Sequence, residues 1–158
     1  MMKPISVWKQ ELSGGAHAAR LAALYCCAPE QTPAQAARYE AVLDGLEATF
    51  GPHAEAGLYS APGRTEIGGN HTDHQHGRVL AGSVNIDMIA AAGPNTLGQL
   101  RVQSEGYDLC VIDLNDLAAR KEEENTSAAI LRGECEAFRQ RGAKLSGLDV
   151  YISSNVPK

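Results

Sequence analysis

One short stretch of this chain gathers residues that could bind a polar small molecule. Residues 62–77 read PGRTEIGGNHTDHQHG, which sets an arginine, an asparagine, an aspartate and three histidines among glycines. Glycines let the backbone turn and approach a ligand where a side chain would clash. The polar side chains between them suit hydroxyl groups and anions. We interpret the stretch as a candidate ligand site; the alternative is a glycine-rich turn with incidental polar residues.

Length and composition limit the classes of protein to which this chain can belong. The chain has 158 residues, 44% hydrophobic and 21% charged, as expected for one globular domain. Its net charge of −5 argues against a broad nucleic-acid or anionic-membrane surface. The beginning of the chain, MMKPISVWKQEL, lacks the apolar run of a signal peptide, and none of the four cysteines forms a C-x-x-C pair. We therefore expect a reduced, cytoplasmic protein with neither nucleic acid nor membrane as partner.

The first fifty residues have helical patterns. Ser13 is a candidate N-cap for a helix that carries Leu21, Leu24 and Tyr25. A second helix is predicted from Thr32 to Phe50, with Thr32 as N-cap, Pro33 in the first turn and Gln35 completing a capping box. Apolar residues spaced by three and four along this helix predict one buried face.

Strand patterns follow the helices. Residues 58–61 lead into the glycine-rich stretch, and strands are predicted within 78–92, at 99–104 and at 109–114. The charged residues 119–125 are interpreted as a solvated connection. A helix is predicted for 127–141, with Ile130, Leu131, Cys135 and Phe138 facing inward, and a last strand for 149–153. This order predicts a mixed α/β or α+β sandwich without an internal domain boundary.

The spacing of the central stretch resembles a known signature. The pattern Gly63-Arg64-x-x-x-x-Gly69-x-His71-Thr72-Asp73 with Gly77, at a strand-to-loop turn after helices, closely resembles that of galactokinases. Galactokinases belong to the superfamily named for galactokinase, homoserine kinase, mevalonate kinase and phosphomevalonate kinase. The resemblance covers roughly residues 30–158, which argues against an incidental turn. It implies that residues 1–158 form one α+β domain, a mixed β-sheet with helices on one side.

The resemblance also implies a reaction and its residues. Galactokinases phosphorylate the C1 hydroxyl of galactose with ATP, and Arg64 matches the arginine that stabilises the transition state. Asn70, His71, Thr72 and Asp73 match positions around the sugar, Thr72 as the residue that orients the loop. Their chemistry fits: ionised Asp73 can accept from two adjacent hydroxyls, and Asn70 and His71 can donate or accept. Ser104 matches a nucleotide contact, although a serine in a strand needs no such role.

Three departures concern the choice of sugar. Most galactokinases have a glutamate where this chain has Asn70, an asparagine in place of Glu66, and a tyrosine in place of His74. Exchanging these groups changes which sugar hydroxyl or substituent finds a partner. The implied substrate is therefore galactose or a galactose-like sugar.

A further departure concerns the end of the pattern. In the family, a segment like SSNVP leads into a glycine-rich phosphate loop, and a catalytic aspartate and a second domain lie beyond it; this sequence stops at Lys158. We therefore expect an N-terminal fragment that is inactive alone. ATP and Mg²⁺ are expected for the complete enzyme, with no cofactor tightly bound to this chain. Self-association through the truncated edge is a further expectation, because the last strand would expose apolar surface.

Two other functions stay open. One is a non-catalytic sugar-sensing module, since some relatives of galactokinases are sensors and a fold does not fix a function. The other is a metal-dependent hydrolase that uses the cluster of His71, Asp73, His74 and His76, because histidine and carboxylate can bind zinc. The spacing of that cluster does not match a familiar hydrolase motif.

Overall fold

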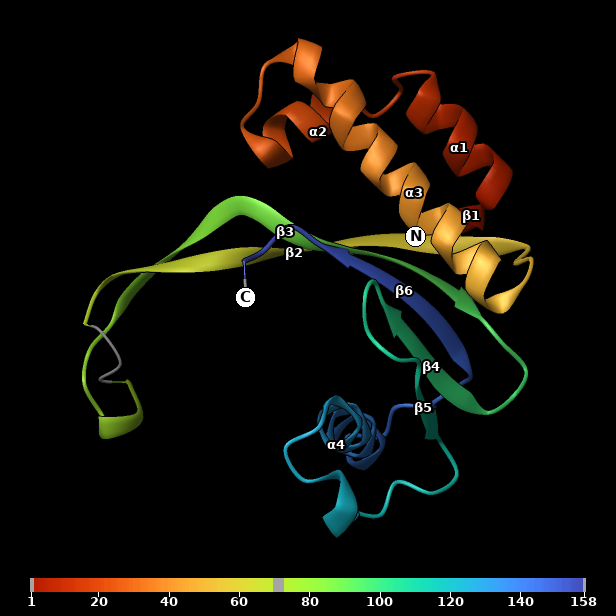
Figure 1. The fold of residues 1–158 in the computed structure, drawn as a ribbon, viewed down its shortest axis with the longest axis vertical. Coiled ribbons are helices and arrows are strands. Elements are labelled where there is room, and N and C mark those ends of the chain that lie inside the picture. Colours follow the sequence, from red (N-terminus) through yellow and green to blue (C-terminus); the bar gives the residue numbers. More distant parts are fainter. Residues whose placement is uncertain (1, 70–72, 158) are drawn as a thin grey trace.

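A mixed β-sheet with four α-helices makes up the protein (Figure 1). The structure, a computed structural model, describes residues 2–69 and 73–157. The helices are α1 (Ile5–Ser13), α2 (Ala18–Tyr25), α3 (Thr32–Phe50) and α4 (Ser127–Gln140). The strands are β1 (Lys3–Pro4), β2 (Glu55–Gly68), β3 (Leu80–Pro94), β4 (Gln99–Ser104), β5 (Cys110–Asp113) and β6 (Leu148–Ser154). Short 3-10 turns are η1 (Pro29–Gln31), η2 (Asp73–Gln75) and η3 (Lys121–Glu123).

The sheet places the last strand in its interior. The strand order is β1-β2-β3-β6-β4-β5, and every pair is antiparallel except β4 with β6. The chain returns through α4, so β6 enters between β3 and β4, and both of its edges are paired. The expected truncated edge is therefore wrong, because β6 is not an edge strand. Self-association itself stays a prediction.

Helices cover both faces of the sheet. Helices α1, α2 and α3 lie on one face, and α4 lies on the other, beside β4 and β5 (Figure 1). Two separate groups of buried side chains agree with this arrangement, one beneath α1–α3 and one beneath α4. The α+β class and the mixed sheet are confirmed. The expected placement of helices on one side holds for α1–α3 but not for α4.

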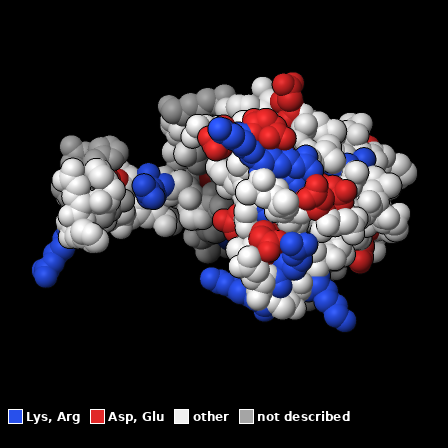
Figure 2. Space-filling model, turned by 90° about the horizontal axis from the view of Figure 1, so that it is seen from below, with Lys and Arg blue, Asp and Glu red and all other residues white. Residues whose placement is uncertain are grey.

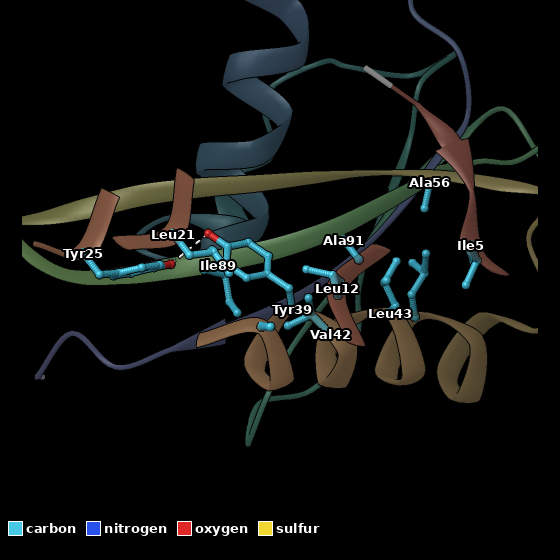
Figure 3. Packing of buried hydrophobic residues seen from close by; sticks show 12 residues of the cluster. Ile5, Leu12, Leu21, Tyr25, Tyr39, Val42, Leu43, Ala56, Ile89 and Ala91 are labelled. Carbon is cyan, nitrogen blue, oxygen red and sulfur yellow. Dashed lines mark hydrogen bonds between the residues drawn. The ribbon is translucent and has the colours of Figure 1, made fainter. Parts of the chain in front are cut away.

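Helix α3 provides the largest part of the core, as its spacing predicts. Its side chains at 36, 39, 42, 43 and 46 are buried against β2, β3 and β6 (Figure 3). Gly51, with φ of +88°, ends the helix in a backbone conformation that other residues rarely adopt. Thr32 is the first helical residue rather than the N-cap, and its hydroxyl donates to the carbonyl of Pro29 at 2.8 Å. Gln35 makes no capping box; its side chain accepts from Arg38.

Two other expectations about helices need correction. Ser13 is the last residue of α1 instead of the N-cap of the next helix, and its hydroxyl donates to the carbonyl of Lys9 at 2.8 Å. In α4, Leu131 and Cys135 pack inward as predicted, but Ile130 and Phe138 are exposed. The inward residues of α4 recur at 128, 131 and 135, and Ile130 points away from that face.

A buried ion pair explains part of the charged connection before α4. Arg132 is buried and donates to both carboxylate oxygens of Glu123, at 2.6 and 2.7 Å. A bidentate pair of this kind has a fixed geometry. Residues 119–125 are thus more than a solvated connection, since Glu123 attaches the connection to α4. Among the described residues, no helix is long and apolar enough to cross a membrane.

Leu43→Ala tests the α3 core. Leu43 is fully buried, and its truncation removes apolar contacts and leaves a cavity. We expect the free energy of unfolding to fall by about 2–5 kcal/mol. Urea titration followed by circular dichroism measures it. Leu97→Ala, at an exposed turn position, is the matched control and should cost under about 1 kcal/mol. Equal losses in the two variants would contradict this view of the core.

Candidate functional site

The glycine-rich stretch lies on an arm that projects from the body of the protein. We call residues 62–84 the arm. Strand β6 pairs with β3 only as far as Met88, and beyond that point β2 and β3 form a two-stranded ribbon. Figure 1 shows this ribbon extending away from the other strands, with η2 at its far end. Figure 2 shows the arm as a lobe beside the main body, with basic side chains visible on it.

The arm is more regular than the sequence indicates. The expected strand-to-loop turn at Gly63 is wrong, because β2 continues to Gly68 and its last pair is Gly68 with Leu80. Pairing persists because backbone hydrogen bonds between strands need no side chains, so glycines weaken a strand without excluding it. The register shifts twice, between Pro62 and Arg64 and between Glu66 and Gly68. Such irregularities bend a ribbon and redirect side chains.

Arg64 lies next to the first of these shifts. It is paired in register with Ser83, and its side chain is exposed. Its neighbour Gly63 is buried, and a Cβ atom there would lie 3.3 Å from Cγ2 of Val156 and 3.2 Å from Cγ2 of Val84. Glycine therefore lets residues 155–157 lie against the arm beside Arg64.

The structure describes only part of the predicted sugar-binding site. Asn70, His71 and Thr72 lie outside the described residues. Asp73 is the first residue of η2, beyond the last pair of the arm, and only its backbone is described. Arg64 is thus on the paired ribbon and Asp73 at its far end. Whether these residues surround one ligand stays a prediction.

Ser104 lies apart from the arm, beside a cavity of about 610 Å³. The cavity lies on the face of the sheet that carries α4, near the start of that helix, and its lining includes Met88, Ser127, Ser154 and Val156. The strand register places Ser104 three strands away from β2 and about 20 Å from Arg64. Val156 is common to both places, since it lines this cavity and contacts the arm at Gly63.

A buried carboxylate that the sequence analysis missed lies at the base of the arm. Asp87 is 2% exposed and is paired in register with Pro62. Its side chain accepts hydrogen bonds from Tyr25 and Ser60, both at 2.6 Å, and from Arg38 at 2.8 Å. Tyr25 is in turn hydrogen-bonded to Tyr39 at 2.8 Å (Figure 3). This network joins α2, α3, β2 and β3 where the arm begins.

The surroundings of Asp87 favour its ionised form. Burial alone raises the pKa of the Asp87 carboxyl, but the hydrogen bonds from Ser60, Tyr25 and Arg38 lower it further, so the pKa lies below its usual value. Burial and the bond to Asp87 raise the pKa of Tyr25, whose hydroxyl therefore stays protonated as a donor. An aspartate inside the apolar run 84–92 is a sequence signal that could have identified this network.

A second buried carboxylate holds β6 and β4 together at the opposite end of the sheet. Asp149 is 1% exposed and accepts two hydrogen bonds from Arg101, both at 2.6 Å. Asn95 donates to it at 2.6 Å, and Nε2 of His53 lies 3.0 Å away. Burial raises the pKa of Asp149, but the bonds from Arg101 and Asn95 outweigh it, and the pKa is lowered. These contacts tie β6 to β4 and to the turn before it.

The alternative metal site finds no support in the part of the chain that the structure describes. No group of three or more histidine, cysteine, aspartate or glutamate side chains there could hold a metal ion. His71, one member of the proposed cluster, lies outside the described residues.

Comparison with known proteins bears on the arm directly. Residues 46–94 match the galactokinase galactose-binding signature, and this range contains Arg64 and residues 70–73. The chain is similar to galactokinases over this range. It is 34% identical to the galactokinase of Streptomyces coelicolor over 103 residues, which cover 64% of this chain and 26% of that protein. It is 27% identical to the galactokinase of Lacticaseibacillus casei over 117 residues, 73% of this chain and 30% of that protein.

Solved structures show the same fold. The crystal structure of Lactococcus lactis galactokinase complexed with galactose matches with a TM-score of 0.63 and 21% identity, over 73% of this chain and 30% of that one. The mevalonate kinase of Methanococcus jannaschii matches with a TM-score of 0.53 and 11% identity, over 67% and 34%. The chain therefore shares the fold of these two structures over the matched residues, and it spans about a third or less of the length of these relatives.

Gly63→Ala tests how the arm is held against the body of the protein. The added methyl group meets Val84, Val156 and the carbonyl of Ile86 at 3.2–3.3 Å, so one of these must move. We expect a loss of about 1–3 kcal/mol in unfolding free energy and changed methyl NMR signals of Val84 and Val156. Gly68→Ala is the matched control, because a Cβ there meets nothing within 4 Å. Unchanged valine signals in Gly63→Ala would contradict the contact.

Asp87→Asn tests the network at the base of the arm. A carboxyl whose pKa is lowered by folding stabilises the fold above its unfolded pKa, and this contribution is lost as the pH falls through the folded pKa. We therefore expect the unfolding free energy of the natural chain to fall below about pH 4. The variant should be less stable by about 3–5 kcal/mol near neutral pH, with a shallower fall in acid.

Urea titrations at a series of pH values measure both effects. Asp108→Asn, at an exposed turn position, is the control and should follow the natural chain. If Asp87→Asn gave the same slope with pH as that control, the ionised carboxylate would not be what holds the network.

Proposed function

We propose that this chain forms the sugar-binding part of a galactokinase-like kinase. The reaction is the transfer of the γ-phosphoryl group of MgATP to the C1 hydroxyl of galactose or a galactose-like sugar. The observation that carries the proposal is the match of residues 46–94 to the galactose-binding signature, which includes the arm. The similar Lactococcus lactis enzyme was crystallised with galactose, which supports a sugar as ligand.

Arg64 is proposed as the residue that stabilises the transition state. During transfer a P–O bond forms to the sugar oxygen, the bond to the β-phosphate of the leaving ADP breaks, and the hydroxyl proton passes to a base. Negative charge spreads over the transferred group, and a guanidinium that keeps its charge at every physiological pH can stabilise it. The exposed position of Arg64 on the arm leaves its side chain accessible to a ligand.

The sugar is proposed to bind through Asn70, His71, Thr72 and Asp73. Buried polar groups discriminate between sugars because the wrong epimer leaves one of them without a partner. Glu66 and His74 lie near them in the sequence and differ from the usual family residues. Because of these differences, the proposed substrate is a galactose-like sugar and is not restricted to galactose itself.

The nucleotide is proposed to bind on the side of Ser104. The cavity of about 610 Å³ there is of the size that small ligands occupy. Val156, which also contacts Gly63, connects this cavity with the arm, so phosphates directed along residues 154–157 would approach Arg64. Magnesium enters with ATP as part of the substrate. A cytoplasmic setting, where ATP is available, completes the proposal.

Titration of the chain with sugars tests the proposal. Calorimetry with galactose, N-acetylgalactosamine and glucose, each with and without MgATP, measures affinity and the choice of sugar. We expect a galactose-type sugar to bind at least about tenfold more tightly than glucose, which differs at one hydroxyl. Asp73→Asn should weaken binding by about tenfold or more, because the ionised acceptor is lost.

The control for this loss is Glu134→Gln, which removes an exposed carboxylate on α4, away from the arm and the proposed nucleotide cavity. Equal affinities for galactose and glucose, or full affinity in Asp73→Asn, would overturn the assignment of the sugar site. Phosphate transfer from MgATP to the bound sugar, measured on a longer chain that includes the family's phosphate loop and second domain, would distinguish the kinase from a sugar sensor.

A further inference from the structure

A second cavity lies on the opposite side of the sheet from Ser104, under the first two helices. Its volume is about 520 Å³, and it lies between α1, α2 and the outer edge of β2. The cavity is lined by Trp8, Leu12, His17, Arg20, Leu21, Ala23, Leu24, Tyr39, Leu58, Tyr59 and Ser60. We call it the α1–α2 pocket. None of its residues belongs to the arm, so it is separate from the sugar and nucleotide sites proposed above.

The walls of the α1–α2 pocket are apolar and partly aromatic. Leu12 and Leu21 belong to the buried core beneath α1–α3, where Figure 3 shows them near Tyr39. The indole of Trp8 is fixed, because its Nε1–H donates to the carbonyl of Ala56 at 2.8 Å. Fixed aromatic and branched side chains favour a flat, apolar ligand body, which loses little conformational freedom on binding.

Two hydroxyl groups at the pocket can only accept hydrogen bonds from a ligand. Ser60 uses its hydrogen in the 2.6 Å bond to Asp87. Tyr25 likewise donates to Asp87, so the 2.8 Å bond between the two tyrosines uses the hydrogen of Tyr39. The oxygens of Ser60 and Tyr39 keep lone pairs but have no hydrogen left to donate. A ligand that reaches them must therefore carry an O–H or N–H donor.

The charged groups around the pocket are both acidic and basic. Two carboxylates lie beside its lining, and each is paired with a basic side chain: Glu11 with Lys3 at 2.6 Å, and Asp87 with Arg38 at 2.8 Å. Arg20 lines the pocket on the exposed side of α2 and makes no ion pair with any other described residue. Its guanidinium can form a bidentate pair with a carboxylate.

These three features specify one class of ligand. We propose that the α1–α2 pocket binds a small aromatic carboxylate that carries a hydrogen-bond donor on its ring. The ring lies between Trp8 and the leucines, the donor reaches Ser60 and Tyr39, and the carboxylate pairs with Arg20. Because Asp87 joins Ser60 to the base of the arm, such a ligand would bind against the network that holds the arm.

NMR titration with 4-hydroxyphenylacetate tests the proposal. Trp8 is the only tryptophan of the chain, so one indole N–H signal reports on the pocket. We expect this signal to shift saturably, with a dissociation constant near or below about 1 mM. Tyramine, with the same ring and hydroxyl but a cationic end, should bind at least about tenfold more weakly. Phenylacetate, which lacks the ring hydroxyl, should bind about fivefold more weakly.

Three variants locate the contacts. Arg20→Gln should weaken the binding of 4-hydroxyphenylacetate by about tenfold. Arg141→Gln, an exposed arginine at the end of α4, is the matched control and should change nothing. Ala23→Phe places a ring into the pocket and should abolish binding.

Several results would overturn the proposal. These are no saturable shift of the indole signal up to about 10 mM ligand, equal affinities for the acid and for tyramine, full affinity in Arg20→Gln, or binding that survives Ala23→Phe. Each of these is independent of whether the arm binds galactose.

Discussion

The carboxylate of Asp87 holds the helical layer to the sheet at the point where the arm begins. It has contacts from α2, α3 and β2, and its own strand is β3, so four elements meet at one buried charge. A buried carboxylate is tolerable only when donors surround it, and here two hydroxyls and a guanidinium do so. Its backbone carbonyl also accepts from the amide of Asn155 at 3.0 Å. The orientation of the arm, and with it the position of Arg64, therefore depends on the fit of these groups.

The two buried carboxylates have related roles at different places. Asp87 joins helices to the β2–β3 pair, whereas Asp149 joins β6 to β4 through Arg101. Both sit in otherwise apolar strands, where a charge without partners would be too costly to bury. Hydrophobic packing alone would allow the layers to slide, while directional bonds to a carboxylate fix one arrangement. The two ends of the sheet are thus fixed independently.

Much of the fold could be predicted from the sequence because its signals are local. The spacing of apolar residues in 32–50 and the apolar runs around 100, 112 and 150 are seen as α3, β4, β5 and β6. Strand order is not local, so the insertion of β6 into the sheet interior could not be predicted by pattern, nor could the placement of α4. The arm was read as a turn because glycines suggest loops, while the pairing partner that keeps it extended lies some fifteen residues further along the chain.

In the candidate site, too, local features could be predicted from the sequence and non-local ones could not. Arg64 and residues 70–73 were assigned through the resemblance of their motif to a galactokinase signature. The family model matches residues 46–94, and the roles of these individual residues stay predictions. Spacing cannot reveal Asp87 or the α1–α2 pocket, since both are produced by residues from distant parts of the chain. A polar residue within an apolar strand is the one local hint of such a site.

The interior position of β6 has a consequence for how the protein acquires its structure. Its partners on β3 are about sixty residues away in the sequence, and those on β4 about fifty. The N-terminal helices and the β2–β3 hairpin are made from neighbouring segments and can assemble first. Until β6 arrives, β3 and β4 each present an unpaired edge. A nascent or partly unfolded chain would thus be most prone to strand exchange along the middle of its sheet, the place that is best protected once folding is complete.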